Sequence, residues 1–159
     1  MFGNIDDIKL NKLRVGFTFN LNREHWEITE VGEYSWNTGE MSTEYTIKNN
    51  TNTIAYLEVE IYKGEYEIYF SEEVFLDDTV LKSAIEAETI IYNDKEFYLE
   101  ETYKGSYKNM TTRSSRERLE NFIFYNKKQM ITIEIWDDEM QVFYGETIKK
   151  KSIKKIKSN

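Results

Sequence analysis

Cysteine and proline are absent from this 159-residue chain, and histidine and glycine are scarce. Without cysteine, the protein has no disulfide, no thiol nucleophile and no thiolate metal site. The seven glycines are scattered, and no glycine-rich loop of the phosphate-binding kind is present. The single histidine, His25, lies in a turn before an aromatic residue, where a structural role is the natural expectation. We therefore predict no catalytic, cofactor-binding or metal-binding residues, and no enzyme.

Long apolar runs are missing as well. No segment approaches the ~20 apolar residues that a membrane-spanning helix needs. The first residues have neither the basic start nor the apolar stretch of a signal peptide. We therefore expect a cytoplasmic protein with no transmembrane segment.

Acidic side chains are in excess, and the net charge is −8. Six lysines lie within residues 149–157, so residues 1–148 keep 15 basic against 29 acidic side chains. Such an acidic body repels phosphate backbones, so we expect no nucleic-acid partner and favour a basic protein or another cation. We predict that residues 149–159 form a mobile basic tail, capable of weak contact with an anionic membrane surface.

Composition and alternation both favour β-strands. Twelve Tyr, nine Phe and three Trp accompany many Ile and Val, which pack well on a pleated sheet. Within residues 55–62, Leu57, Val59 and Ile61 alternate with Tyr and Glu, and residues 131–136 alternate likewise, as half-buried antiparallel strands do. Strands are predicted at roughly 15–21, 25–33, 43–49, 55–62, 65–70, 88–92, 95–103, 119–126, 130–136 and 140–147. Their apolar positions predict a core of Val15, Phe17, Phe19, Trp26, Ile28, Leu57, Val59, Ile61, Phe97, Leu99, Ile131, Ile133 and Ile135.

The chain also resembles itself. Residues 21–28 resemble 92–99, residues 57–60 resemble 133–136, and residues 67–69 resemble 142–144, in the same order. We predict a single all-β domain over 1–159, made of two similar antiparallel hairpin units at approximately 13–76 and 88–148. The units would form a barrel or a two-sheet sandwich. Residues 77–86 are predicted as one short linking helix, and residues 114–119 as a further helical turn.

One face of the strands at 55–62 and 65–70 carries tyrosines among carboxylates. The second unit offers an equivalent face in residues 132–136. Aromatic rings among carboxylates can bind a cationic group, and aromatic residues are also enriched at protein interfaces. The alternative is that these rings only cover the sheet through cross-strand pairs. The candidate binding face consists of Tyr56, Glu58, Glu60, Tyr62, Glu65, Glu67, Tyr69, Glu134 and Trp136.

Several short motifs, taken in order, resemble a known family. They are Leu-Arg-Val-Gly at 13–16, Trp26, the Glu-Tyr strand at 42–47, Ala-Tyr-Leu-Glu-Val-Glu at 55–60, Phe-Tyr-Leu-Glu-Glu at 97–101, Ile-Glu-Ile-Trp at 133–136 and Tyr-Gly-Glu-Thr-Ile at 144–148. Together they resemble the bacterial domain-of-unknown-function family numbered 4178, over most of residues 10–148. Tyr56 stands where many family members have tryptophan. The resemblance implies no activity, because none is assigned to the family.

Three classes of function stay open on this basis. The leading hypothesis is a non-enzymatic protein-binding or adaptor module, for example an immunity-type protein that neutralises a basic toxin. The alternative is a barrel that binds a small ligand, with polyamine-like cations the most compatible; an enzyme is the third class. A cavity of a few hundred Å³ lined by convergent polar groups would favour the ligand. A filled interior with an exposed aromatic patch would favour the adaptor.

Overall fold

The alternating segments form strands that are joined largely by tight turns. The computed structural model describes residues 9–137 and 139–158. Pairs of residues with positive φ, Asn22–Arg23 and Asn93–Asp94, make the two-residue turns that open each half of the chain. The strands are β1 (Thr18–Leu21), β2 (Glu24–Trp36), β3 (Met41–Asn49), β4 (Ile54–Tyr62), β5 (Glu65–Val74), β6 (Thr89–Tyr92), β7 (Lys95–Asn109), β8 (Glu117–Asn126), β9 (Gln129–Ile135), β10 (Met140–Ile148) and β11 (Lys154–Lys157).

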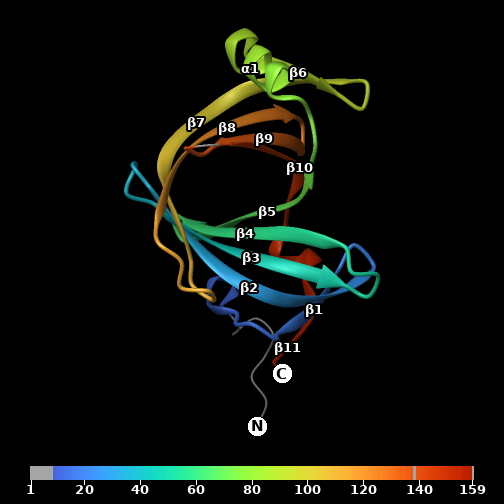
Figure 1. Cartoon of the computed structure of the whole chain (residues 1–159). Coiled ribbons are helices and arrows are strands. Elements are labelled where there is room, and N and C mark those ends of the chain that lie inside the picture. Colours follow the sequence, from blue (N-terminus) through green and yellow to red (C-terminus); the bar gives the residue numbers. More distant parts are fainter. Residues whose placement is uncertain (1–8, 138, 159) are drawn as a thin grey trace.

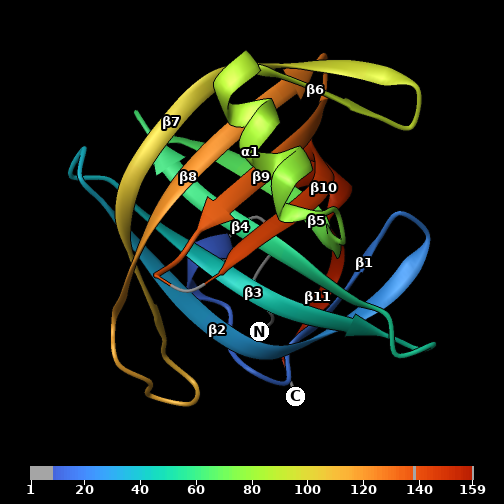
Figure 2. The ribbon, with the colours of Figure 1, turned by 45° about the horizontal axis from the view of Figure 1, so that its top comes forward.

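All eleven strands belong to one antiparallel sheet. Their order is β11-β1-β2-β3-β4-β5-β10-β9-β8-β7-β6, and β2 also pairs with β7. Residues Gly32–Trp36 of β2 lie against Gly105–Asn109 of β7 in this additional pairing. Because β2 and β7 stand near opposite ends of the strand order, their pairing bends the sheet into a partial ring (Figures 1 and 2).

Two glycines allow β2 and β7 to approach each other. A β-carbon at Gly32 would overlap the ring of Tyr107, and one at Gly105 would overlap the backbone oxygen of Ser35 and the ring of Trp36. A strand glycine often marks such a close approach between backbones or rings. The pairing of β2 with β7 therefore depends on the absence of side chains at these two positions.

The outer face of β2–β5 carries the first apolar core. Trp26, Ile28, Ile47 and Leu57 are fully buried there. A short 3₁₀ helix (η2, Leu10–Lys12), β1 and the C-terminal segment cover this face, contributing Leu10, Leu13, Phe19, Leu21 and Ile153. In Figure 1 these elements lie below β2, β3 and β4.

A second apolar core lies on the outer face of β7–β10. The helix α1 (Asp78–Ala87) begins after Asp77 and buries Leu81 and Ala84. These two side chains pack with residues of β6 and the sheet, including Ile90, Phe97, Phe124, Ile131, Ile133 and Val142. Figure 2 shows α1 lying across β8 and β9. Both apolar faces of the curled sheet are thus covered from outside, and the polar faces point into the ring.

A strand lies at each of the ten predicted places, and the predicted helix at 77–86 is α1. The helical turn predicted at 114–119 is wrong, because β8 already begins at Glu117. Two predicted core residues are also wrong. Val15 is 44% exposed because it lies in a turn before β1, and Ile61 is 46% exposed at the end of β4.

The basic C-terminal segment is not a mobile tail. A 3₁₀ helix (η3, Lys150–Ser152) leads into β11, which pairs with β1 at Thr18 and Asn20. Ile153 is 5% exposed and belongs to the first apolar core. The alternation of lysines with two isoleucines anchors this segment at the sheet edge, so the prediction of mobility is wrong. No helix in the described residues is long and apolar enough to span a bilayer.

Truncating Ile133 should strongly destabilise the protein. Its side chain, on β9, is completely buried in the second apolar core, which also contains Leu81 and Ala84 of α1. We expect Ile133→Ala to reduce the free energy of unfolding by roughly 2–5 kcal/mol, because the substitution removes buried methyl groups and leaves a cavity. Ile91→Ala is the matched control, since Ile91 is 73% exposed on β6; we expect it to change stability by less than about 0.5 kcal/mol. Urea denaturation would measure both, and equal effects would contradict the assigned strand faces.

Candidate functional site

The inside of the ring is lined by the polar faces of the strands. Alternation along β4 places Leu57 and Val59 in the outer core, so Glu58 and Glu60 point inward. The larger cavity inside the ring has a volume of about 670 Å³. A smaller cavity of about 420 Å³ lies toward the other ends of the same strands. Polar strand faces that would be solvated on an open sheet thus surround two interior spaces.

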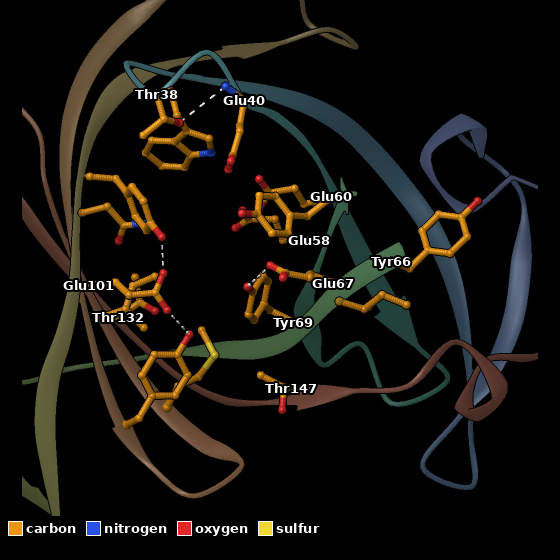
Figure 3. Close-up of a pocket in the computed structure, with 18 of the residues that line it drawn as sticks. Thr38, Glu40, Glu58, Glu60, Tyr66, Glu67, Tyr69, Glu101, Thr132 and Thr147 are labelled. Carbon is orange, nitrogen blue, oxygen red and sulfur yellow. Dashed lines mark hydrogen bonds between the residues drawn. The ribbon is translucent and has the colours of Figure 1, made fainter. Parts of the chain in front are cut away.

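Five carboxyl groups line the larger cavity. Glu58 and Glu60 come from β4, Glu67 from β5 and Glu101 from β7, while Glu40 precedes β3. Figure 3 shows the labelled Glu58, Glu60 and Glu67 pointing across the cavity toward Glu101. Carboxylates from strands far apart in the sequence therefore converge on one space.

The smaller cavity is lined by three more carboxyl groups and several aromatic rings. Glu30 lies on β2, Glu44 on β3 and Glu134 on β9. The Tyr56 and Phe143 rings pack edge to face there, with their centroids 5.5 Å apart. The smaller cavity is therefore acidic and aromatic, like the larger one.

Basic side chains are missing from both linings. Among the described residues, none of those that line either cavity is Lys, Arg or His. The ion pair found in the described part of the chain joins Arg116 Nη2 to Glu33 Oε1 at 3.0 Å, outside both cavities. Within the described residues, no ion pair therefore balances the eight carboxyl groups that line the cavities.

A tyrosine hydroxyl connects two of these carboxyl groups. Tyr34, which is 2% exposed, has its hydroxyl oxygen 3.1 Å from Glu44 Oε2 and 3.1 Å from Glu134 Oε2. A tyrosine hydroxyl has one proton to donate. Two full hydrogen bonds form when one carboxyl group is protonated and donates to the tyrosine oxygen. The geometry therefore favours a proton shared within this group.

Burial raises the pKa values of the interior carboxyl groups. Desolvation, followed by the nearby charge of Glu58, raises the pKa of Glu134 to about 8. Desolvation also raises the pKa of Glu58 to about 7, although a hydrogen bond from Ser42 opposes the change. For Glu60, desolvation and the neighbouring Glu40 raise the pKa to about 8. Desolvation also raises the pKa of Glu44. Glu58, Glu60 and Glu134 therefore change charge in or near the physiological pH range.

Hydrogen bonds fix the orientation of several cavity side chains. Trp36 Nε1 donates to Ser42 Oγ at 3.2 Å, and Ser42 Oγ donates to Glu58 Oε2 at 2.9 Å. On the opposite wall, Tyr125 donates to Glu101 Oε1 at 3.0 Å, and Tyr103 donates to the other oxygen of the same carboxylate. Hydrogen bonds within the protein therefore orient side chains on both walls.

Two acceptor atoms in the larger cavity have no partner. Asn121 is 5% exposed, and its Oδ1 atom is buried without a hydrogen bond. Glu60 Oε1 is also buried and unpaired. An unsatisfied buried acceptor costs on the order of 1–3 kcal/mol, and native proteins contain few of them. Both atoms would accept a hydrogen bond from an N–H donor placed in the cavity.

The structure brings together most of the candidate face around the interior of the ring, although Tyr62 and Glu67 stay exposed. Glu134 is 6% exposed inside the ring, and Glu58 is half-buried there. The reason is the pairing of β2 with β7, which curls the sheet. The larger cavity is lined by Glu58, Glu60, Tyr62, Glu67 and Tyr69, and the smaller by Tyr56, Glu134 and Trp136; Glu65 lines neither.

Sequence reasoning missed the opposite wall and the centre of the interior. Glu101 and Tyr103 alternate along β7 in the same Tyr-Glu manner as the residues of β4. Both residues lie within the predicted strand at 95–103, but simple alternation from Phe97 and Leu99 would place Glu101 on the core face, and only the register shift between Leu99 and Glu101 turns it inward. Tyr34 and Asn121 carried no such signal, because their importance comes only from the groups they meet across the ring.

His25 and a metal centre find no support as alternative sites. His25 is exposed, and its Nδ1 atom lies 2.9 Å from Asn20 Oδ1 in the turn between β1 and β2. Across residues 9–137 and 139–158, no three acidic or histidine side chains gather closely enough to hold a metal ion. The interior of the ring is therefore the site that the geometry supports.

The fold and its interior define a curled antiparallel sheet around an acidic, aromatic space. The model of the family described as "Domain of unknown function (DUF4178)" matches residues 14–150. The chain therefore belongs to this family. No curated protein matches the chain. No solved structure matches it either.

The raised carboxyl pKa values predict that stability falls as pH rises. The pKa of Glu134 rises from 4.5 to about 8, so between these values the folded chain holds a proton that the unfolded chain has lost. The contribution of this proton to the free energy of unfolding is complete below about pH 4.5 and disappears as pH rises through about 8. We expect the melting temperature to fall by several degrees between about pH 6 and pH 9, at roughly 2–4 °C per kcal/mol for a chain of this size.

Glu134→Gln should flatten that dependence. An amide keeps the shape of a protonated carboxyl but cannot ionise, so we expect the variant to be more stable than the natural protein at about pH 9 by on the order of 1–3 kcal/mol. Glu65→Gln is the control, since Glu65 lies on an exposed hairpin end. Thermal unfolding followed by circular dichroism would measure the melting temperatures of the natural protein and both variants across this pH range. A melting temperature that rises toward pH 9 in the natural protein would contradict the assignment.

Proposed function

We propose that the interior of the ring binds an organic cation bearing ammonium groups, of the polyamine-like kind. The observation that carries this proposal is the set of eight interior carboxyl groups with no Lys, Arg or His among the residues that line the cavities. An ammonium group supplies both the missing charge and the missing hydrogen-bond donors. Its binding would relieve the desolvation and like-charge repulsion that now raise the carboxyl pKa values.

The aromatic side chains of the larger cavity support the same class of ligand. Trp36, Tyr69, Tyr103 and Tyr125 all line it. The face of an aromatic ring attracts a cation, and this attraction is stronger when the cation is desolvated. The alkyl part of a polyamine would also lie against these rings, so one ligand satisfies both kinds of wall.

The proposal includes a finer description of the fold. In each half, five consecutive strands pair in chain order, β1 to β5 and β6 to β10. The two halves meet through strands at equivalent positions, β5 with β10 and β2 with β7. This arrangement supports our inference that residues 13–76 and 88–148 are a repeated unit, and that the two units close into a barrel around the ligand.

A second candidate function is binding of a basic protein at the mouth of the larger cavity. Tyr62 is 42% exposed there, and Glu67 is exposed next to it. A lysine or arginine side chain of a partner could enter the same acidic space. This use would preserve the adaptor hypothesis, with the mouth of the cavity as its contact.

Isothermal titration calorimetry with spermidine, a linear triamine, tests the proposed function. We expect saturable binding to the natural protein and at least about tenfold weaker binding to Glu101→Gln, equivalent to about 1.4 kcal/mol. Glu100→Gln is the matched control, because Glu100 is the neighbouring residue on β7, is exposed and lines neither cavity. Absence of spermidine binding by the natural protein, or equal binding by both variants, would contradict the proposal.

Cation binding should release protons. The carboxyl groups of Glu58 and Glu60, with pKa values raised to about 7 and about 8, are partly protonated near neutral pH, and a bound ammonium favours their ionised forms. We therefore expect the affinity for spermidine to rise between about pH 6 and pH 8. Calorimetry in buffers of different ionisation enthalpy would measure the released protons directly. An affinity that is constant or falls over this interval would count against a site made of these carboxyl groups.

A further inference from the structure

The carboxyl groups inside the ring lie at two levels along the strands. On the first level, Glu44 of β3 is directly opposite Glu58 of β4. On the second level, Glu60 of β4 is directly opposite Glu67 of β5. Like charges directly opposite each other destabilise an antiparallel pair. The sheet thus holds two such unfavourable pairs, one after the other, at the wall of the same interior.

The spacing between the levels follows from strand geometry. Glu58 and Glu60 are two residues apart on the same face of β4, so their α-carbons are separated by about 6.8 Å along the strand. This separation is close to the span of the five single bonds that join the nitrogens of a four-carbon diamine. The sheet itself therefore sets a distance between two centres of negative charge.

Each level also has an unpaired hydrogen-bond acceptor. Glu60 Oε1 is buried and unpaired on the second level. Asn121 is only 5% exposed, and its Oδ1 atom has no hydrogen-bond partner. It lies opposite Glu134 in the β8–β9 pairing. Glu134 belongs to the first level because Tyr34 joins it to Glu44. Asn121 is neutral, so its unmet acceptor is an observation independent of the acidic cluster, and it calls for an N–H donor.

We propose that the interior selects a linear diammonium unit in which four carbons separate the two nitrogens. One ammonium group would lie at the Glu58 level near Asn121, and the other between Glu60 and Glu67. This inference rests on the proposed function, and it names the ligand class and the residues that determine its length. The alkyl chain would lie between the two levels, beside Tyr69, which is opposite Glu58, and Ser42, which is opposite Glu60.

A series of α,ω-diamines with two to six carbons tests this inference by calorimetry, with 1-aminobutane as the single-charge reference. We expect 1,4-diaminobutane to bind best, at least about tenfold more tightly than 1,2-diaminoethane and 1-aminobutane. A flat series, or a monoamine that binds as well as the diamine, would overturn this inference while leaving the proposed function in place if spermidine still binds. Absence of binding by spermidine and every amine would overturn the proposed function itself.

Two variants locate the second ammonium group. Glu67→Gln should reduce the preference for 1,4-diaminobutane over 1-aminobutane to less than about threefold, because the second level loses a charge. Glu65→Gln, on the same face of β5 but outside the cavities, should preserve the full preference. Far-ultraviolet circular dichroism would confirm that both variants fold. An unchanged preference in Glu67→Gln would show that the second level does not bind the ligand, and would overturn the inference.

Discussion

The pairing of β2 with β7 is the contact on which the other features depend. It joins residues 69 to 77 positions apart, Gly32–Trp36 with Gly105–Asn109, and bends the sheet on itself. Aromatic packing supports it from inside, since the Tyr34 and Trp36 rings stack with centroids 4.9 Å apart and Tyr107 packs against Tyr34. Without this pairing, the Tyr-Glu faces of β4 and β9 would be solvated surfaces, and their carboxyl groups would have ordinary hydration.

The strands turn their polar faces toward the inside of the ring, the reverse of the arrangement usual in a small ring of strands. Here the apolar faces point outward and are buried by α1, β6, β1, η2 and the C-terminal segment. Stability can therefore come from the two outer cores, and the interior is free to contain groups that weaken the fold. Buried carboxyl groups with raised pKa values and unpaired acceptors such as Asn121 Oδ1 are unfavourable for folding alone. Features of this kind concentrate at functional sites.

A proton and an organic cation are alternative partners for the same carboxyl groups. Burial raises the pKa values of Glu44, Glu58 and Glu134, and neighbouring carboxylates raise those of Glu44 and Glu134 further, so protons reduce the cost of holding these groups in the interior. A cation bound there takes over that role. The protein's stability, its proton binding and its affinity for a cation are therefore different expressions of one electrostatic imbalance inside the ring.

The sequence alone determined the strands, their two faces and the linking helix, because these depend on local alternation and on helix-start signals within a few residues. It did not determine which face would be enclosed. Alternation says that Leu57 and Glu58 point to opposite sides of β4, but the curvature that makes one side the interior comes from the distant pairing of β2 with β7. For the same reason, Ile153 became a core residue and Asn121 a cavity residue only when the tertiary structure brought their neighbours to them.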